Sequence, residues 1–231
     1  MPRPIRISLE GLVYHIINRG NNRQDVFKDE EDLDTYLKII KRFKDKYSFK
    51  FYGYCLMNNH THLVIEPTRA NTLSKIIQSI TLSQIRLYHS KYKSSGHLWQ
   101  GRFKNPIIQN DGYLLQCLKY IELNPVRAKI VSMPEDYRWS SYRFHVFNKD
   151  EYRILDYDPA YLSLANTDQD RQKAYRDFVV KEQDKNILNL IKKSITNDSI
   201  LGSESFINEL KGKLILSKSR PKGRPRKIIN S

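Results

Sequence analysis

The sequence has little of what covalent or membrane-based architectures require. It contains two cysteines, Cys55 and Cys117, each in an apolar segment, which excludes a disulfide scaffold and indicates a reducing compartment. No apolar run approaches the ~18–20 residues of a membrane span, and the first residues lack the apolar core of a signal peptide. Acidic residues are also scarce, with 25 Asp and Glu against 40 Lys and Arg. The resulting net charge of +15 points to a polyanionic partner, either nucleic acid or an acidic membrane surface.

The order of apolar patterns predicts an α+β fold. A short strand is expected over 14–19, a helix capped by Asp29 up to Tyr47, a β-hairpin over 49–65 and a helix from residue 71 or 72 to Tyr88. A fourth strand is expected within 102–108 despite Pro106, followed by a helix from Asp111 that ends or kinks at Pro125. This β-α-β-β-α-β order is that of a ferredoxin-like sandwich.

We predict three parts along the chain. Residues 1–145 form the main domain, and residues 146–210 form a helical extension with helices near 186–195 and 203–210. Residues 211–231 hold eight Lys and Arg and no acid, together with Gly and Pro, a composition typical of a disordered basic tail.

Two pairs of residues have the spacing of a metal-assisted active site. His60 and His62 are two apart in an expected strand, so both imidazoles lie on one face and can reach one metal ion. Tyr120 and Asn124 are one helical turn apart, so a phenol and an amide oxygen share a face. A metal on two imidazoles and an amide would leave positions open for phosphate oxygens while the tyrosine attacks. The alternatives are ordinary polar strand residues and a core aromatic.

Four sequence blocks occur together in a characteristic order and spacing. They are YHIINRGNNR (14–23), YCLMNNHTHL (54–63), WQGRFK (99–104) and YIELNPVR (120–127). Together they resemble the single-tyrosine HUH transposases of bacterial insertion sequences, and within them the REP-associated tyrosine transposases. The resemblance covers residues 5–145.

This resemblance implies roles for the four candidate residues. His60 and His62 would be metal ligands, Asn124 the third ligand and Tyr120 the nucleophile, with Mg²⁺ or Mn²⁺ as the ion. The implied reaction is a metal-dependent transesterification on single-stranded DNA hairpins through a 5′-phosphotyrosine intermediate, in a cytoplasmic, nucleoid-associated protein acting as monomer or homodimer. No phosphate-binding G-x-x-x-x-G-K-[ST] sequence is present, and this chemistry needs no nucleotide hydrolysis. One departure is Thr61, where the family has a bulky hydrophobe, and we expect its side chain to face away from the metal. The amide Asn124 is what the REP-associated branch implies, whereas mobile relatives often have Gln.

Further residues are candidates for DNA contacts. We expect the basic residues to pair with phosphates. The amides of the glycine loop (residues 20–24) read base edges or form a polar turn, and the tryptophan stacks on a base or covers the sheet. A Gly-Arg-Pro core in the tail resembles an AT-hook for A·T-rich duplex flanks, with a solubilising tail as the alternative. We expect His15 to be structural. The candidates are Arg19, Asn21, Asn22, Arg23, Gln24, Trp99, Arg102, Lys104, Arg224 and Arg226.

Three other functions compete with this interpretation. A DNA-binding regulator could keep the fold and no longer cut. A hydrolytic metal nuclease is suggested by Asn59-His60, but that class uses a histidine base and no tyrosine. A role at a membrane surface is the weakest, because no basic amphipathic helix stands out.

Overall fold

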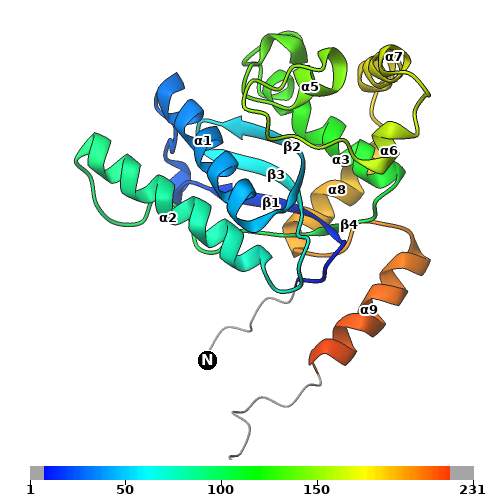
Figure 1. The fold of residues 1–231 in the computed structure, drawn as a ribbon, viewed down its shortest axis with the longest axis horizontal. Helices are drawn as coiled ribbons and strands as arrows, with labels where there is room; N and C mark the ends of the chain where they lie inside the picture. The colour runs from blue at the N-terminus through cyan, green and yellow to red at the C-terminus, as the bar shows by residue number, and fades with distance from the viewer. Residues whose placement is uncertain (1–7, 219–231) are drawn as a thin grey trace, which may run out of the picture.

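A computed structural model describes residues 8–218 of the chain. At its centre is an antiparallel four-stranded sheet in the order β2-β3-β1-β4 (Figure 1). The strands are β1 (Val13–Arg19), β2 (Lys50–Met57), β3 (His60–Glu66) and β4 (Ile107–Ile108). Helix α1 (Glu30–Tyr47) connects β1 to β2, and α2 (Leu73–Tyr92) connects β3 to β4. The α+β class and the β-α-β-β-α-β order of elements therefore match the prediction.

Helix α1 begins where the sequence predicts it. The Asp29 carboxylate accepts a hydrogen bond of 3.0 Å from the Asp32 amide, and Glu30, Glu31 and Asp32 place negative charge at the positive end of the helix dipole. The helix ends at Ser48, which adopts a left-handed conformation with φ of 51°. Cap and dipole together fix the start of the helix that follows the glycine loop.

Two predicted boundaries are wrong. Only Ile107 and Ile108 of the expected strand 102–108 form β4, because Pro106 has no N–H to give to the sheet; an isolated bridge from Lys104 to Ile17 continues the pairing. The predicted start of the basic tail at residue 211 is also too early, because helix α9 (Glu204–Lys218) includes residues 211–218. The apolar residues Leu214, Ile215 and Leu216 extend the helical run that the charge count obscured.

The remaining helices follow the sheet in the sequence. They are α3 (Gly112–Glu122), α4 (Asn124–Arg127), α5 (Tyr142–Phe147), α6 (Pro159–Leu162), α7 (Asp168–Val180) and α8 (Lys185–Asn197), with short 3₁₀ turns η1 (Asn21–Arg23) and η2 (Pro134–Asp136). One apolar cluster runs from the sheet into Tyr161, Tyr175 and Ile191. The core is thus continuous across residue 145, and the division there stays a prediction. Among the described residues, no helix has both the length and the apolarity needed to cross a membrane.

The two faces of the sheet have different partners. In Figure 1, α1 and α2 lie to the left of the sheet and α3 and α8 to the right. Helix α3 packs closely on β2 at Gly53, where an added Cβ would lie 2.4 Å from the Leu118 side chain. Thr61 lies on the other face, beside the buried Tyr36. Burial raises the pKa of Tyr36, and the Thr61 hydroxyl lowers it in part. The side chain between the two histidines therefore points away from them, as predicted.

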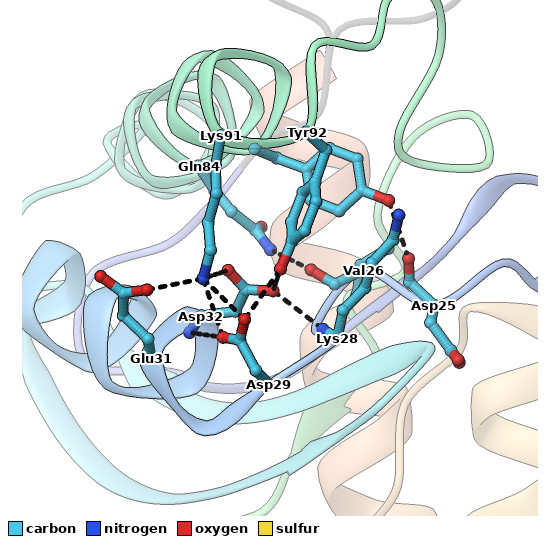
Figure 2. A network of polar contacts seen from close by, with 10 residues as sticks. Asp25, Val26, Lys28, Asp29, Glu31, Asp32, Gln84, Lys91 and Tyr92 are labelled. Atoms are coloured by element: carbon cyan, nitrogen blue, oxygen red, sulfur yellow. Dashed lines mark hydrogen bonds and ion pairs between the residues drawn. The ribbon is translucent and has the colours of Figure 1, made fainter.

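A polar network fixes the glycine loop against α1 and α2 (Figure 2). The Lys91 ammonium at the end of α2 lies 2.8 Å from Asp29 and 3.0 Å from Asp32 at the start of α1. The Asp32 carboxylate also accepts a hydrogen bond of 2.8 Å from the Lys28 amide, and Gln84 donates to the Val26 carbonyl over 3.3 Å. These contacts hold the loop that carries Asn21–Arg23 at the end of β1.

Candidate active site

The two histidines of the motif lie together on the central strand β3. Their ring centroids are 5.1 Å apart, with His60 half-buried and His62 buried. His60 Nδ1 is 2.6 Å from Asn59 Oδ1, which leaves Nε2 as its second nitrogen. Antiparallel pairing places the His60 backbone opposite Arg19 and the His62 backbone opposite Ile17. The strand therefore brings both imidazoles to one face, as the spacing predicts.

A third histidine contacts this pair from the neighbouring strand. His15 Nε2 lies 2.7 Å from His62 Nδ1, and the Cys117 Sγ of α3 is 3.6 Å from His15 Nδ1. With Nδ1 engaged, the second nitrogen of His62 is Nε2, which is how an outer partner fixes the orientation of a ligating imidazole. The structural role expected of His15 thus includes a hydrogen bond to His62, a candidate metal ligand. The sequence concealed it because the two residues are 47 positions apart.

Burial keeps these imidazoles neutral at pH 7. It lowers the pKa of His15 to about 3, and together with the nearby Arg19 charge it lowers the pKa of His60 to about 4. The pKa of His62 also falls well below its usual value through burial and the charges of its neighbours, including Arg127. A neutral imidazole retains the lone pair that a metal ion or a proton requires.

These shifts predict that the protein loses stability as the pH falls from 7 to 5. His15 and His60 titrate near pH 6.5 in the unfolded chain but near 3 and 4 in the fold, so the unfolded chain binds more protons in this window. Each should contribute a loss of about 2 kcal/mol in the free energy of unfolding. His62, whose pKa also lies well below its usual value, adds to the loss in the same direction. Urea titrations at both pH values measure the total, and His15→Asn should remove about 2 kcal/mol of it. Equal stability at pH 7 and 5 would contradict the neutral assignment.

Tyr120 lies against this cluster from helix α3. Its ring meets His62 edge to face, with centroids 6.2 Å apart and planes at 89°. Partial burial raises the pKa of Tyr120, while the positive charges of Arg127 and Arg19 lower it. The phenol is therefore protonated at neutral pH and surrounded by charges that favour its anion.

Asn124 follows a break in the helix after Tyr120. Helix α3 ends at Glu122 and α4 begins at Asn124, with Pro125 at the next position, so the end or kink expected at Pro125 is confirmed. The Asn124 Oδ1 accepts a hydrogen bond of 2.5 Å from Arg127, and its Nδ2 is buried without a partner among the described residues. The amide is connected to the tyrosine through this arginine.

Arg127 is the site residue that sequence reasoning missed. Its guanidinium lies 4.5 Å from the Tyr120 ring centroid, donates to the Tyr120 carbonyl and holds the Asn124 amide. The available signal was its spacing, seven residues after Tyr120 and three after Asn124, which would place all three on one face of an unbroken helix.

The candidate metal ligands are two imidazole nitrogens and one amide oxygen. His60 and His62 are hydrogen-bonded through Nδ1, so Nε2 is the nitrogen that each would offer to a divalent cation, and Asn124 would offer Oδ1, which accepts a hydrogen bond from Arg127. Within residues 8–218, no group of three His, Cys, Asp or Glu side chains is arranged to hold a metal. The candidate set contains only two such side chains and depends on the Asn124 amide for its third ligand.

A buried polar cluster supports the helix that carries Tyr120. The Glu122 carboxylate accepts hydrogen bonds from Ser141 Oγ (2.5 Å), Tyr175 OH (2.8 Å) and His145 Nδ1 (2.8 Å). The side chains of Glu122 and His145 are fully buried. Since Ser141 and His145 lie at α5 and Tyr175 lies on α7, one carboxylate joins three helices.

A buried lysine makes a second connection between α3 and the extension. Lys119 is 2% exposed, and its ammonium donates to the carbonyls of Phe178 (2.7 Å) and Lys181 (2.6 Å) at the end of α7. The residues after 145 are thus attached to the two sides of the turn that bears Tyr120.

The predicted DNA-contacting residues fall into different environments. Arg19 is exposed at the end of β1, where its charge acts on His60, His62 and Tyr120. Gln24 donates from its amide to the His97 and Leu98 carbonyls, both over 3.1 Å, so it joins two loops. Its amide nitrogen is therefore occupied in this conformation.

The other candidates differ in how far they are exposed to solvent. Asn22 and Arg23 are exposed in η1, Asn21 is half-buried beside them, and Arg102 is exposed. Lys104 is half-buried and donates to the Thr196 carbonyl over 3.1 Å. Trp99 is 9% exposed, so its ring covers the sheet more than it faces solvent. Arg224 and Arg226 lie outside the described residues.

The site consists of two histidines on an inner strand of an antiparallel sheet and a helical tyrosine that faces them. The chain belongs to the IS200-like transposase family, whose sequence model matches residues 8–124. That match includes His60, His62, Tyr120 and Asn124.

Individual relatives are consistent with this family. A Haemophilus influenzae protein assigned as a REP-associated tyrosine transposase is 26% identical in an alignment of 121 residues that covers 48% of this chain and 68% of the relative. The solved structure of a REP-associated tyrosine transposase bound to a REP hairpin superimposes with a TM-score of 0.53 at 18% identity, covering 69% of this chain and 96% of that one. A transposase structure from Deinococcus radiodurans gives a TM-score of 0.38 at 18% identity, over 59% and 97% of the two chains. The predicted resemblance to REP-associated tyrosine transposases is confirmed.

Proposed function

We propose that this protein is a metal-dependent endonuclease and strand transferase for single-stranded DNA that cuts at hairpin-forming repeats. The observation that carries the proposal is the edge-to-face contact of Tyr120 with His62, with Arg127 over the tyrosine ring. A phenol beside a neutral imidazole and a fixed positive charge can be activated as a nucleophile, and the charge can stabilise the negative charge that develops in phosphoryl transfer. The match to a transposase bound to a hairpin supports the substrate class.

The proposed reaction is a transesterification, in which one phosphoester bond is exchanged for another. The Tyr120 phenol oxygen attacks the scissile phosphorus, and the bond from phosphorus to the 3′-oxygen breaks. The phenol loses its proton, the departing 3′-oxygen gains one, and the 5′-phosphate stays on the tyrosine. Burial raises the pKa of Tyr120 and so opposes loss of its proton. The positive charges of Arg127 and Arg19 lower this pKa and would assist the step by stabilising the developing phenolate. A returning 3′-hydroxyl reverses the reaction and joins strands.

His60, His62 and Asn124 would hold Mg²⁺ or Mn²⁺ in this proposal. The bound ion would supply Lewis acidity to the phosphate oxygens. In the residues themselves, Asn59 and His15 fix the two imidazoles through their Nδ1 atoms. These outer contacts keep both Nε2 atoms available on one face of β3.

The DNA strand would approach at the end of β1. Arg19, Arg23 and Arg102 are exposed there and carry charges suited to phosphates. Residues 1–145 would be the catalytic domain, 146–210 an extension that holds α3, and the basic tail a contact to A·T-rich duplex beside the hairpin. Binding should therefore weaken steeply with added salt.

Deletion of residues 218–231 should weaken binding to hairpins with A·T-rich duplex flanks more than it slows cleavage of a short single strand. The deleted segment carries basic residues around a Gly-Arg-Pro core, so it adds duplex affinity without touching the chemistry. Anisotropy titrations of both DNAs, with full-length and shortened protein, provide the measurement. Equal duplex binding by the two proteins would remove the AT-hook proposal.

The proposed function is tested on hairpin oligonucleotides taken from the DNA around the protein's own gene. Wild-type protein is incubated with each hairpin and Mg²⁺ or Mn²⁺, then resolved on a denaturing gel. We expect a slow-migrating protein–DNA adduct that requires the metal and is lost in His60→Ala. Tight hairpin binding without an adduct would instead indicate a regulator that does not cut.

A further inference from the structure

Arg127 contacts the oxygen atom that is proposed to bind the metal ion. Its guanidinium donates a hydrogen bond of 2.5 Å to Asn124 Oδ1, and the same Nη2 atom donates to the Tyr120 carbonyl. Its positive charge also acts on His62, one of the two candidate imidazole ligands. The guanidinium therefore lies beside the ligands that a divalent cation would use.

The charge of this guanidinium is not neutralised by an acidic side chain. Among the described residues, Arg127 donates to two neutral oxygens and forms no ion pair with a carboxylate. The acidic residue closest to it in the sequence is Glu122, which is fully buried in the hydrogen-bonded cluster described above. The charge of Arg127 therefore acts directly on any cation that binds at Asn124.

Arg127 can give up the Asn124 oxygen without leaving the site. Its side chain is exposed to solvent, and its guanidinium also lies 4.5 Å from the Tyr120 ring centroid. That second contact lets the guanidinium stay over the tyrosine when it turns away from the amide. An ion and a guanidinium at one carbonyl oxygen draw on the same lone pairs, and their like charges repel.

We propose that Arg127 competes with the divalent ion for the Asn124 oxygen and leaves that oxygen when the ion binds. The inference rests on the proposed function and adds a means of regulating the same site. The released guanidinium can pair with a DNA phosphate next to Tyr120. Because a phosphate draws the guanidinium away from Asn124, DNA and the ion favour each other's binding. Arg127 thus keeps the affinity for the ion low until a strand is present.

Binding of Mn²⁺ to the full-length protein tests this competition. Electron paramagnetic resonance measures free Mn²⁺ during a titration, and the binding that His60→Ala removes belongs to the site. Arg127→Gln removes the charge but keeps an N–H that can donate to Asn124, whereas Arg127→Lys keeps the charge. Arg127→Met repeats the loss of charge with a side chain that can still pack on the Tyr120 ring. Melting curves show which variants are folded.

Arg86→Gln is the matched control for the loss of one positive charge. Arg86 is exposed on helix α2, which lies on the other side of the sheet from α3 (Figure 1). This variant has the same net charge as Arg127→Gln but keeps the guanidinium at Asn124. It separates a local competition from a general change in electrostatic attraction.

Without DNA, Arg127→Gln and Arg127→Met should bind Mn²⁺ at least about tenfold more tightly than wild type, because a repelling charge is removed. Arg127→Lys and Arg86→Gln should stay close to wild type. The same titrations are repeated with a hairpin in a Tyr120→Phe background, which prevents the proposed cutting. The hairpin should tighten Mn²⁺ binding about tenfold less in Arg127→Gln than in the protein that retains Arg127.

Unchanged or weaker Mn²⁺ binding by the folded Arg127→Gln or Arg127→Met protein would overturn the competition and show that Arg127 only orients the amide. Equal tightening by the hairpin with and without Arg127 would overturn the coupling to DNA. Both results would leave the proposed function standing. If no Mn²⁺ binding depends on His60, even with the hairpin present, the proposed function and the competition fail together.

Discussion

Tyr120→Phe should abolish formation of the protein–DNA adduct, with a residual rate at least about 10³-fold below wild type. The substitution removes one oxygen, the atom proposed to attack phosphorus, and keeps the ring that packs against His62 and Arg127. Hairpin binding should change little, because the phenol oxygen is proposed to act in the reaction and not in recognition. A quantitative denaturing gel and a parallel anisotropy titration separate the two effects.

Tyr113→Phe is the matched control for this variant. Tyr113 belongs to the same helix, seven residues earlier, and is half-buried like Tyr120. It should react at the wild-type rate. Full activity of Tyr120→Phe would exclude the tyrosine mechanism and favour a metal nuclease that activates water.

Glu122→Leu should lower the free energy of unfolding by about 3–5 kcal/mol. The carboxylate is fully buried and accepts hydrogen bonds from Ser141, His145 and Tyr175. Its removal leaves the His145 Nδ1 and Tyr175 hydroxyl donors unpaired, while Ser141 keeps the Tyr54 carbonyl as an acceptor. Unpaired buried groups cost more than the bonds themselves contribute. Urea unfolding followed by circular dichroism gives the value.

Glu151→Gln is the control for the loss of a carboxylate. Glu151 forms an ion pair of 2.8 Å with Arg138, and both side chains are about half exposed, at 50% and 46%. Surface pairs of this kind contribute at most about 1 kcal/mol. A Glu122→Leu protein as stable as Glu151→Gln would show that the buried cluster does not hold α3 to α5 and α7.

The sequence predicts the part of this molecule that depends on local spacing. The alternation of β3 places His60 and His62 on one face, and the helical turn after Tyr120 places Asn124 nearby. Asp29 caps α1 because a carboxylate before an acidic first turn satisfies free amides. These features need only the period of a strand or a helix.

The features that depend on distant pairing could not be predicted. His15 contacts His62 because β1 pairs with β3, and Glu122 meets Tyr175 because α7 folds back onto α3. Neither contact has a local signature. The predicted fourth strand is too long because Pro106 interrupts the pairing, which strand propensity alone does not reveal.

The central claim is that Tyr120 itself becomes joined to DNA, and mass spectrometry of the adduct tests it most directly. Wild-type protein is reacted with its hairpin in Mg²⁺ or Mn²⁺, the adduct is isolated, and nuclease and protease digestion leave a peptide carrying one nucleotide. The account predicts a 5′-phosphodeoxynucleotide on Tyr120. A nucleotide on any other residue, or cleaved strands ending in free phosphate with no adduct, would contradict it.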